Sequence, residues 1–156
     1  MISTVVAIFT TPESGATLLS VAAATLESGK GLVGDRYYKG NGTFSEKLKS
    51  SQDWEITLIE NEEIERFNKL GNSAFSPAEF RRNIITSGVR LNDLVGRRFS
   101  VGSTVLEGIR LCEPCAYLAK FIGPASVQTL AHRAGLRARI LSGGVVRAGD
   151  RIEELA

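Results

Sequence analysis

The chain has 156 residues, a length that supports one substantial hydrophobic core, so we expect a single domain over residues 1–156. Its composition, 43% hydrophobic and 23% charged residues, is ordinary for a soluble globular protein and argues against extended disorder. The formal net charge of +2 is too small to indicate a nucleic-acid-binding protein.

The N-terminal segment, MISTVVAIFTTPESG, lacks the basic start of a secretory signal and the long apolar run of a membrane span. We therefore expect a cytoplasmic protein that makes no membrane contact. In the cytoplasm the two cysteines, Cys112 and Cys115, would be reduced. Their location thus favours a thiol or metal role over a structural disulfide.

Most of the predicted elements are short strands. In chain order, the apolar patterns predict strands at 4–9 and 17–24, a polar loop over 38–51, a strand at 54–59 and a helix over 60–71 that Gly71 caps. They then predict strands at 82–87, 98–101 and 104–111, and short helices near 115–122 and 127–134, the second with Ser126 as its N-cap and Gly135 as its stop. Strands at 136–142 and 150–155 follow, with glycine turns at 143, 144 and 149 between them. Short strands joined by glycine turns favour a barrel or a curved sheet.

The segment LCEPCAYLAKF, residues 111–121, is the most informative local sequence. A strand ends there, Pro114 fits the first turn of a helix, and an apolar helical segment begins. Cys115 then lies where free backbone N–H groups and the positive end of a helix dipole favour a thiolate. Glu113 opposes that effect, and a nearby arginine would reinforce it. Cys115 is therefore the candidate reactive residue, and a small buried hydrophobic residue is the alternative.

Cys112 and Cys115 also form a C-x-x-C pair, which is found in redox disulfides and in zinc sites. A structural zinc site usually needs four ligands, whereas this chain offers two cysteines and His132. No βαβ pattern surrounds the pair, so a thioredoxin-like site is not favoured either. Nothing in the sequence places His132 beside a nucleophile, which argues against a hydrolase. A protective or resolving role for Cys112 stays open.

Arginines cluster in the second half of the chain, at positions 81, 82, 90, 97, 98, 110, 133, 137, 139 and 147. Individually they are expected on a solvated surface, but as a converging set they indicate a site for a compact anion. The run GKGLVGDR, residues 29–36, does not match a P-loop, although it could direct backbone N–H groups and Arg36 toward an anion.

Five blocks in this order resemble the MOSC domain, which is related to the C-terminal domain of molybdenum-cofactor sulfurases. They span residues 29–152 and read GLVGDR (31–36), DWEITLIE (53–60), FRRNIITSGVRLNDLVGRRFSVG (80–102), LCEPCAYL (111–118) and AHRAGLRARILSGGVVRAGDRI (131–152). The resemblance implies a mainly β fold, a closed or partly closed barrel similar to the β-barrel of pyruvate kinase, with a few short helices. It also implies a stand-alone domain without the aminotransferase-like part of the full sulfurases.

The resemblance assigns the characteristic cysteine of the family to Cys115, as the catalytic residue and as the metal ligand. The family's Gly-Asp-Arg turn falls on Arg36 and its Arg–Asn pair on Arg82 and Asn83, which implies that these residues bind the molybdenum cofactor (molybdopterin) or a related pterin-phosphate or sulfur-bearing group. Charge matching to a phosphate adds Arg133 and Arg137, with Arg82, as candidate ligands of the same group. Relatives often carry histidine after the Gly-Asp-Arg turn, whereas this chain has Tyr37, which leaves a proton-transfer role there in doubt.

Two kinds of chemistry stay open at this stage. The domain could be a small molybdoenzyme, an oxidoreductase that reduces N-hydroxylated or similar substrates with an electron-donor protein. It could instead be a sulfur transferase or carrier in metal–sulfur cofactor assembly, charged by a sulfur donor. A non-catalytic β-barrel module that binds an anionic ligand or a partner protein is the alternative from a different class.

Overall fold

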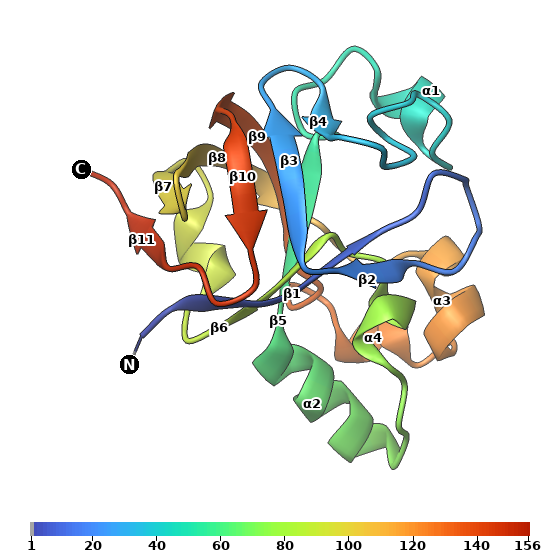
Figure 1. Ribbon diagram of the computed structural model, residues 1–156. Helices are drawn as coiled ribbons and strands as arrows, with labels where there is room; N and C mark the ends of the chain where they lie inside the picture. Colours follow the sequence, from blue (N-terminus) through green and yellow to red (C-terminus); the bar gives the residue numbers. More distant parts are fainter. Residues whose placement is uncertain (1) are drawn as a thin grey trace.

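The structure, a computed structural model, describes residues 2–156 and consists mainly of β-strands in two sheets (Figure 1). The larger sheet has eight strands in the order β11-β7-β8-β9-β5-β6-β1-β2. They are β1 (Thr4–Thr10), β2 (Leu19–Val21), β5 (Ile56–Glu60), β6 (Ile84–Ser87), β7 (Arg98–Val101), β8 (Thr104–Leu111), β9 (Leu136–Ser142) and β11 (Ile152–Glu154). The smaller sheet has the order β10-β3-β4, with β3 (Ala23–Glu27), β4 (Gly31–Leu32) and β10 (Gly144–Arg147). The expected mainly β fold is confirmed.

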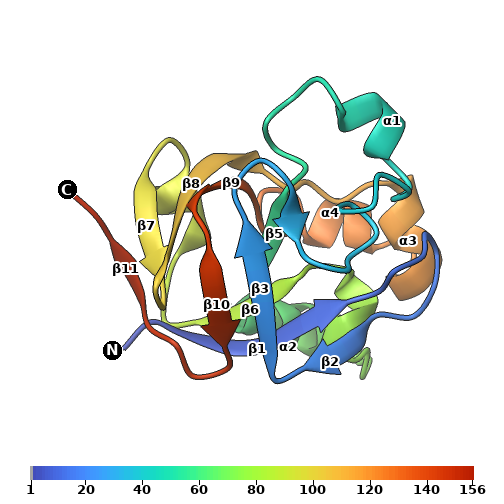
Figure 2. The ribbon, with the colours of Figure 1, turned by 45° about the horizontal axis from the view of Figure 1, so that its top comes forward.

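The two sheets do not close into a barrel, so the closed form of the expected barrel is wrong. The larger sheet keeps two edge strands, β2 and β11. A single antiparallel bridge joins Thr4 to Arg151, and the backbone N–H of Ile152 donates to the carbonyl of Ser3 at 2.9 Å. The sheets stay separate because β3 pairs with β10 and β4 and does not extend the larger sheet beyond β2. The result is a strongly curved, open arrangement (Figure 2).

Within residues 2–156, six helical segments accompany the sheets: α1 (Ser45–Leu48), α2 (Asn61–Gly71), η1 (Pro77–Phe80), η2 (Leu91–Leu94), α3 (Ala116–Ile122) and α4 (Ser126–Thr129). Strands β5 and β6 pair in parallel, and α2 and η1 lie in the connection between them. A parallel pair needs such a crossover, because a tight hairpin can join only antiparallel strands. No helix within residues 2–156 is both long and apolar enough to cross a membrane.

Several predicted boundaries are corrected by the structure. Gly71 is the last residue of α2, and Asn72, with a left-handed φ of 49°, is the cap. The helix expected over 127–134 ends at Thr129, because the chain continues as turns through His132 (φ 60°). Strand β10 was not predicted, since the glycines at 143, 144 and 149 indicated turns; its pairing with β3 defines it.

Two apolar clusters lie on opposite faces of the larger sheet, and neighbouring residues of one strand contribute to each. In β5, Leu58 belongs to the first cluster and Ile59 to the second, and in β6 Ile84 and Ile85 divide in the same way. This alternation follows from the two-residue repeat of a strand. The second cluster includes residues of α2, η1 and α3, so these helices cover one face near the β5–β6 pair.

Candidate functional site

A pocket forms where the segment after β8 meets the loop after β4 and the outward face of β9. Both cysteines and four arginines line it: Cys112, Cys115, Arg36, Arg81, Arg82 and Arg137. This inner pocket is small, about 40 Å³. It adjoins an outer pocket of about 200 Å³, because Phe44, Glu113, Cys115 and Arg137 line both. Together they form one cleft that has Cys115 in the wall common to its inner and outer parts.

Cys115 is the N-cap residue of α3 and has an extended backbone, with φ −144° and ψ 174°. The helix begins at Ala116, one residue after the predicted start, so Pro114 lies outside its first turn and not within it. The thiol makes no capping hydrogen bond, is a free cysteine and is partly exposed to solvent. Cys115 packs on one side against the second apolar cluster, and it also lines both parts of the cleft, where a ligand could reach it.

Cys112 is also free, but it is 2% exposed. Its backbone N–H donates to the carbonyl of Gly135 at 2.8 Å, and its own carbonyl accepts from Arg82 at 3.0 Å. Residues 112–115 contain neither a turn nor a bend. Cys115, at the end of this segment, has an extended backbone, and both cysteines are free thiols.

Arg81 carries the least satisfied polar group of the cleft. It is the C-cap of η1 in a left-handed conformation, with φ 62° and ψ 30°, and it is 5% exposed. One terminal nitrogen, Nη1, donates to the carbonyl of Ala16 at 2.9 Å, whereas Nε and Nη2 have no partner among residues 2–156. A buried donor without a partner is costly, and a guanidinium stays charged in proteins. The unpaired edge of Arg81 therefore suits an anion.

The surroundings of Arg81 are aromatic and positively charged. Its guanidinium carbon lies 4.4 Å from the ring centre of Phe121 and 5.9 Å from that of Tyr117. Burial, and then the nearby charge of Arg36, lower the pKa of Arg81 below its ordinary value. The hydroxyl of Tyr117 is a second buried polar atom for which no partner is found within residues 2–156. Two neighbouring groups of the same cleft are thus free to bind a ligand.

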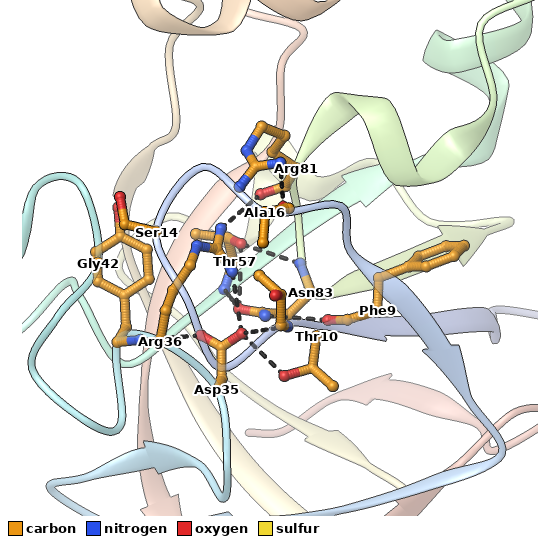
Figure 3. Close-up of polar contacts among 12 residues, drawn as sticks. Phe9, Thr10, Ser14, Ala16, Asp35, Arg36, Gly42, Thr57, Arg81 and Asn83 are labelled. Carbon is orange, nitrogen blue, oxygen red and sulfur yellow. Dashed lines mark hydrogen bonds and ion pairs between the residues drawn. The ribbon is translucent and has the colours of Figure 1, made fainter.

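Arg36 is held by an acidic neighbour (Figure 3). Its Nη1 donates to Oδ1 of Asp35 at 3.0 Å, and its Nη2 donates to the carbonyl of Arg81 at 3.4 Å. Asp35 also accepts from the hydroxyl of Thr10 at 2.9 Å and from the backbone N–H of Tyr37 at 3.2 Å. The Gly-Asp-Arg turn is therefore a buried hydrogen-bonded corner that fixes Arg36 beside the pocket.

Arg82 and Asn83 contribute mainly to the wall of the cleft. Arg82 donates to three backbone carbonyls, those of Ala134 at 2.9 Å, Cys112 at 3.0 Å and Phe80 at 3.3 Å. Asn83 accepts from the backbone N–H and the hydroxyl of Thr57 and donates to the carbonyl of Phe9. Arg82 lines the pocket, but its donors are engaged; Asn83 is buried and does not line the pocket.

The last two predicted arginines differ in position. Arg137 lies on the outward face of β9, opposite Thr57 of β5, because Leu136 and Ala138 on either side of it face the core. It lines both parts of the cleft. Arg133 does not line the cleft; its Nη1 pairs with Oε2 of Glu63 on α2 at 3.0 Å.

The sequence did not single out Arg81 or Tyr117. Arg81 was one member of the arginine cluster, and its neighbour Arg82 was selected by the family's Arg–Asn pair. Tyr117 belonged to the apolar helical segment after Cys115. The left-handed φ at Arg81 and the missing partners of both side chains are visible only in three dimensions.

Tyr37 stands at the edge of the cleft. Burial raises the pKa of its hydroxyl, although the charge of Arg36, 4.9 Å from the ring centre, opposes the rise. The hydroxyl accepts from the backbone N–H of Phe44 at 3.4 Å. Tyr37 therefore stays protonated at neutral pH, where a histidine could exchange a proton.

Ion pairs secure the outer rim. Arg110 pairs with the buried carboxylate of Asp53. Burial alone would raise the pKa of Asp53, but hydrogen bonds from Ser51 and Arg110 outweigh it and hold that pKa below its ordinary value. Glu113 accepts from the backbone N–H of His132 at 2.7 Å and contacts its ring. His132 therefore serves the turn after α4 and lies outside the lining of the cleft.

Comparison with known proteins identifies the family. A family model described as MOSC domain matches residues 45–153, and the chain belongs to this family. The match begins after the Gly-Asp-Arg turn, so Arg36 lies outside it. A search of curated proteins finds no match to this sequence.

Solved structures share the fold. The YuaD protein of Bacillus subtilis superposes with a TM-score of 0.82 at 18% identity, over 99% of this chain and 96% of that one. YiiM of Geobacillus stearothermophilus gives 0.76 at 16% identity, over 99% and 75%. YiiM of Escherichia coli gives 0.69 at 19% identity, over 100% and 70%. At these identities the likeness concerns the fold alone.

Proposed function

We propose that this MOSC-domain protein binds the molybdenum cofactor, or a related pterin-phosphate or sulfur-bearing group, in the cleft around Cys115. The observation that carries the proposal is the buried, half-paired guanidinium of Arg81 in the same pocket as an accessible thiol. Arginine binds phosphate through parallel, charge-assisted hydrogen bonds, and a thiolate is a soft ligand for metal or sulfur. The two groups match the two ends of such a ligand.

The donor set supports a cofactor more than a bare metal ion. Within residues 2–156 no group of three or more His, Cys, Asp or Glu side chains is arranged to hold a metal. Cys115 could supply a single thiolate, so molybdenum would have to arrive with most of its own ligands, as it does in a cofactor. The inner pocket of about 40 Å³ has room for a compact anionic group, and the outer pocket of about 200 Å³ for a larger part of the ligand.

Each lining residue then has a separate task. Arg81 and Tyr117 bind the anionic group with their unpaired donors, and Arg36 adds positive charge from its fixed position. Arg137 binds the ligand where the inner and outer parts meet. Arg82 and Asn83 keep the wall in place through their bonds to the backbone. Arg133 pairs with Glu63 outside the cleft and takes no part in this proposal.

Cys115 has one of two roles in this function. In a small molybdoenzyme that reduces N-hydroxylated substrates, it ligates the metal, and the bound cofactor supplies the electron transfer. In a sulfur carrier for metal–sulfur cofactor assembly, it holds a sulfane sulfur as a persulfide. Both roles need a thiol that reaches the cleft, which the partial exposure of Cys115 allows.

The test is molybdenum and pterin analysis of protein expressed in a host that makes the cofactor. We expect bound molybdenum in the wild type and its loss in Cys115→Ser and in Arg81→Gln. Arg147→Gln, which changes an exposed arginine of β10, is the matched control and should retain the metal. Equal metal content in all four proteins would contradict the proposed site.

A protein without molybdenum but with a persulfide on Cys115 would establish the sulfur-carrier form. The absence of both would favour a non-catalytic module for an anionic ligand. Such a module would still bind its anion through Arg81. Phosphate binding by the wild type that is lost in Arg81→Gln would indicate the module, and no phosphate binding by either protein would indicate that the anion site does not exist.

A further inference from the structure

A second cavity shares Tyr37 with the inner pocket that both cysteines line. It measures about 220 Å³, and its walls include three aromatic side chains and two lysines: Tyr37, Tyr38, Trp54, Lys39 and Lys49. Tyr37 also lines the inner pocket beside Cys115, so its ring is a common wall of the two cavities. The function proposed above makes no use of this second cavity.

The Tyr37 wall is fixed in place. Its ring stacks near the guanidinium of Arg36, 4.9 Å from the ring centre, and its hydroxyl accepts from the backbone N–H of Phe44. Gly42 packs so closely that an added Cβ would lie 2.7 Å from Cε1 of the ring. Only glycine leaves room there, so the loop is shaped around this tyrosine.

The Tyr38 hydroxyl is held by a bond outside the cavity, and the residues on both sides of Trp54 are anchored in the same way. The hydroxyl of Tyr38 donates to Glu27 of β3 at 2.8 Å. Trp54 stands between two buried acidic residues, of which Asp53 pairs with Arg110 and Glu55 accepts from the backbone N–H of Ile140 at 3.1 Å. Walls that are ordered before a ligand arrives reduce the entropy lost on binding.

The charge of the cavity has one sign. Lys39 and Lys49 lie at its rim, and none of the described residues that line it is acidic. Lys49 contacts Glu46 at 2.6 Å, but both side chains are largely exposed, and such a surface pair is weak and easily exchanged. A ligand with a negative charge would therefore gain contacts here.

From these features we propose that the cavity binds a planar aromatic ring that carries a carboxylate. The three aromatic side chains offer stacking and edge contacts to a flat ring, and the lysines pair with the anion. A volume of about 220 Å³ lies below the range of about 300–1,000 Å³ that drug-sized ligands occupy, so it suits one ring system. The site is independent of cofactor binding at Cys115.

Trp54 gives a direct assay because it is the sole tryptophan of the sequence, so its indole N–H produces one NMR signal. Three probes separate ring from charge: naphthoate has both, naphthamide has the ring alone, and cyclohexanecarboxylate has the charge alone. We expect a saturable shift of the Trp54 signal with naphthoate, binding about tenfold weaker with naphthamide, and no saturable shift with cyclohexanecarboxylate.

Variants locate the site. Lys39→Ala/Lys49→Ala should weaken naphthoate about fivefold to tenfold, whereas Lys30→Ala/Lys69→Ala, which removes the same charge from exposed positions elsewhere, should leave it unchanged. Arg81→Gln should also leave naphthoate binding unchanged. The proposal is overturned if naphthoate gives no saturable shift, if naphthamide binds equally well, or if Arg81→Gln abolishes binding while the Lys39/Lys49 variant does not.

Discussion

Arg81→Met should stabilise the protein in the absence of any anion, although it removes a charged residue from the candidate site. The substitution eliminates two buried N–H donors that have no partner, each of which costs about 1–3 kcal/mol. It also removes the bond to Ala16, worth about 1 kcal/mol, and the contact of the guanidinium with Phe121, worth about 1–2 kcal/mol. We estimate a net gain of about 1.5 kcal/mol, or roughly 3–6 °C in Tm for a chain of this length.

The assay is thermal unfolding in anion-poor buffer and again with added phosphate. Wild-type Tm should rise with phosphate, because a ligand that binds only the folded state stabilises it, and Arg81→Met should lose that rise. Arg82→Met is the matched control: it leaves three backbone carbonyls without a donor and should cost about 3 kcal/mol. A fall in Tm for Arg81→Met comparable to that of Arg82→Met would refute the argument that the unpaired donors of Arg81 destabilise the protein when no anion is bound.

Three further predictions concern the thiols, the rim and the backbone. Native alkylation followed by mass spectrometry should modify Cys115 readily and Cys112 slowly, because Cys112 is 2% exposed; equal rates would contradict the structure. Asp53→Asn should make the free energy of unfolding less dependent on pH in acid. The pKa of Asp53 is lower in the folded than in the unfolded protein, so its carboxylate stabilises the fold above the unfolded pKa of about 4, and this contribution is lost as pH falls through the folded pKa. Gly135→Ala should lower the free energy of unfolding by about 3 kcal/mol or more, because φ is 113° and the added Cβ would lie 2.0 Å from the carbonyl oxygen of Leu58 in β5. Gly149→Ala, where φ is 93° but the space is open, should lower it by about 1 kcal/mol. Denaturant unfolding measures both.

Local pattern was enough to predict the strands whose apolar residues are regular. The expected ranges 98–101, 104–111 and 136–142 coincide with β7, β8 and β9. The helix over 60–71 was found to within one residue at its start, because its apolar residues repeat at helical spacing. These elements carry their information within a few residues of sequence.

The missed features depend on partners distant in the sequence. Strand β10 exists because Gly144 to Arg147 pair with β3, more than a hundred residues earlier, whereas Gly144 and the glycines on either side of the strand indicated turns. The separation of the two sheets depends in the same way on strand pairing, because β3 pairs with β10 and β4 and not with the larger sheet. Short strands with glycine are defined by their pairing, so the closed barrel was a reasonable expectation that local pattern could not test.

Within the site, sequence chemistry could not distinguish two adjacent arginines. Arg81 and Arg82 have the same side chain and similar burial, yet one has unpaired donors and the other has three bonds to carbonyls. The difference arises from the left-handed φ at Arg81, which turns the chain between η1 and β6 so that the two side chains make separate sets of contacts. That conformation costs a non-glycine residue about 1–2 kcal/mol, a cost that glycine would avoid. Backbone strain and unpaired donors at one residue both oppose stability, and this combination is the one expected where a side chain is kept for binding.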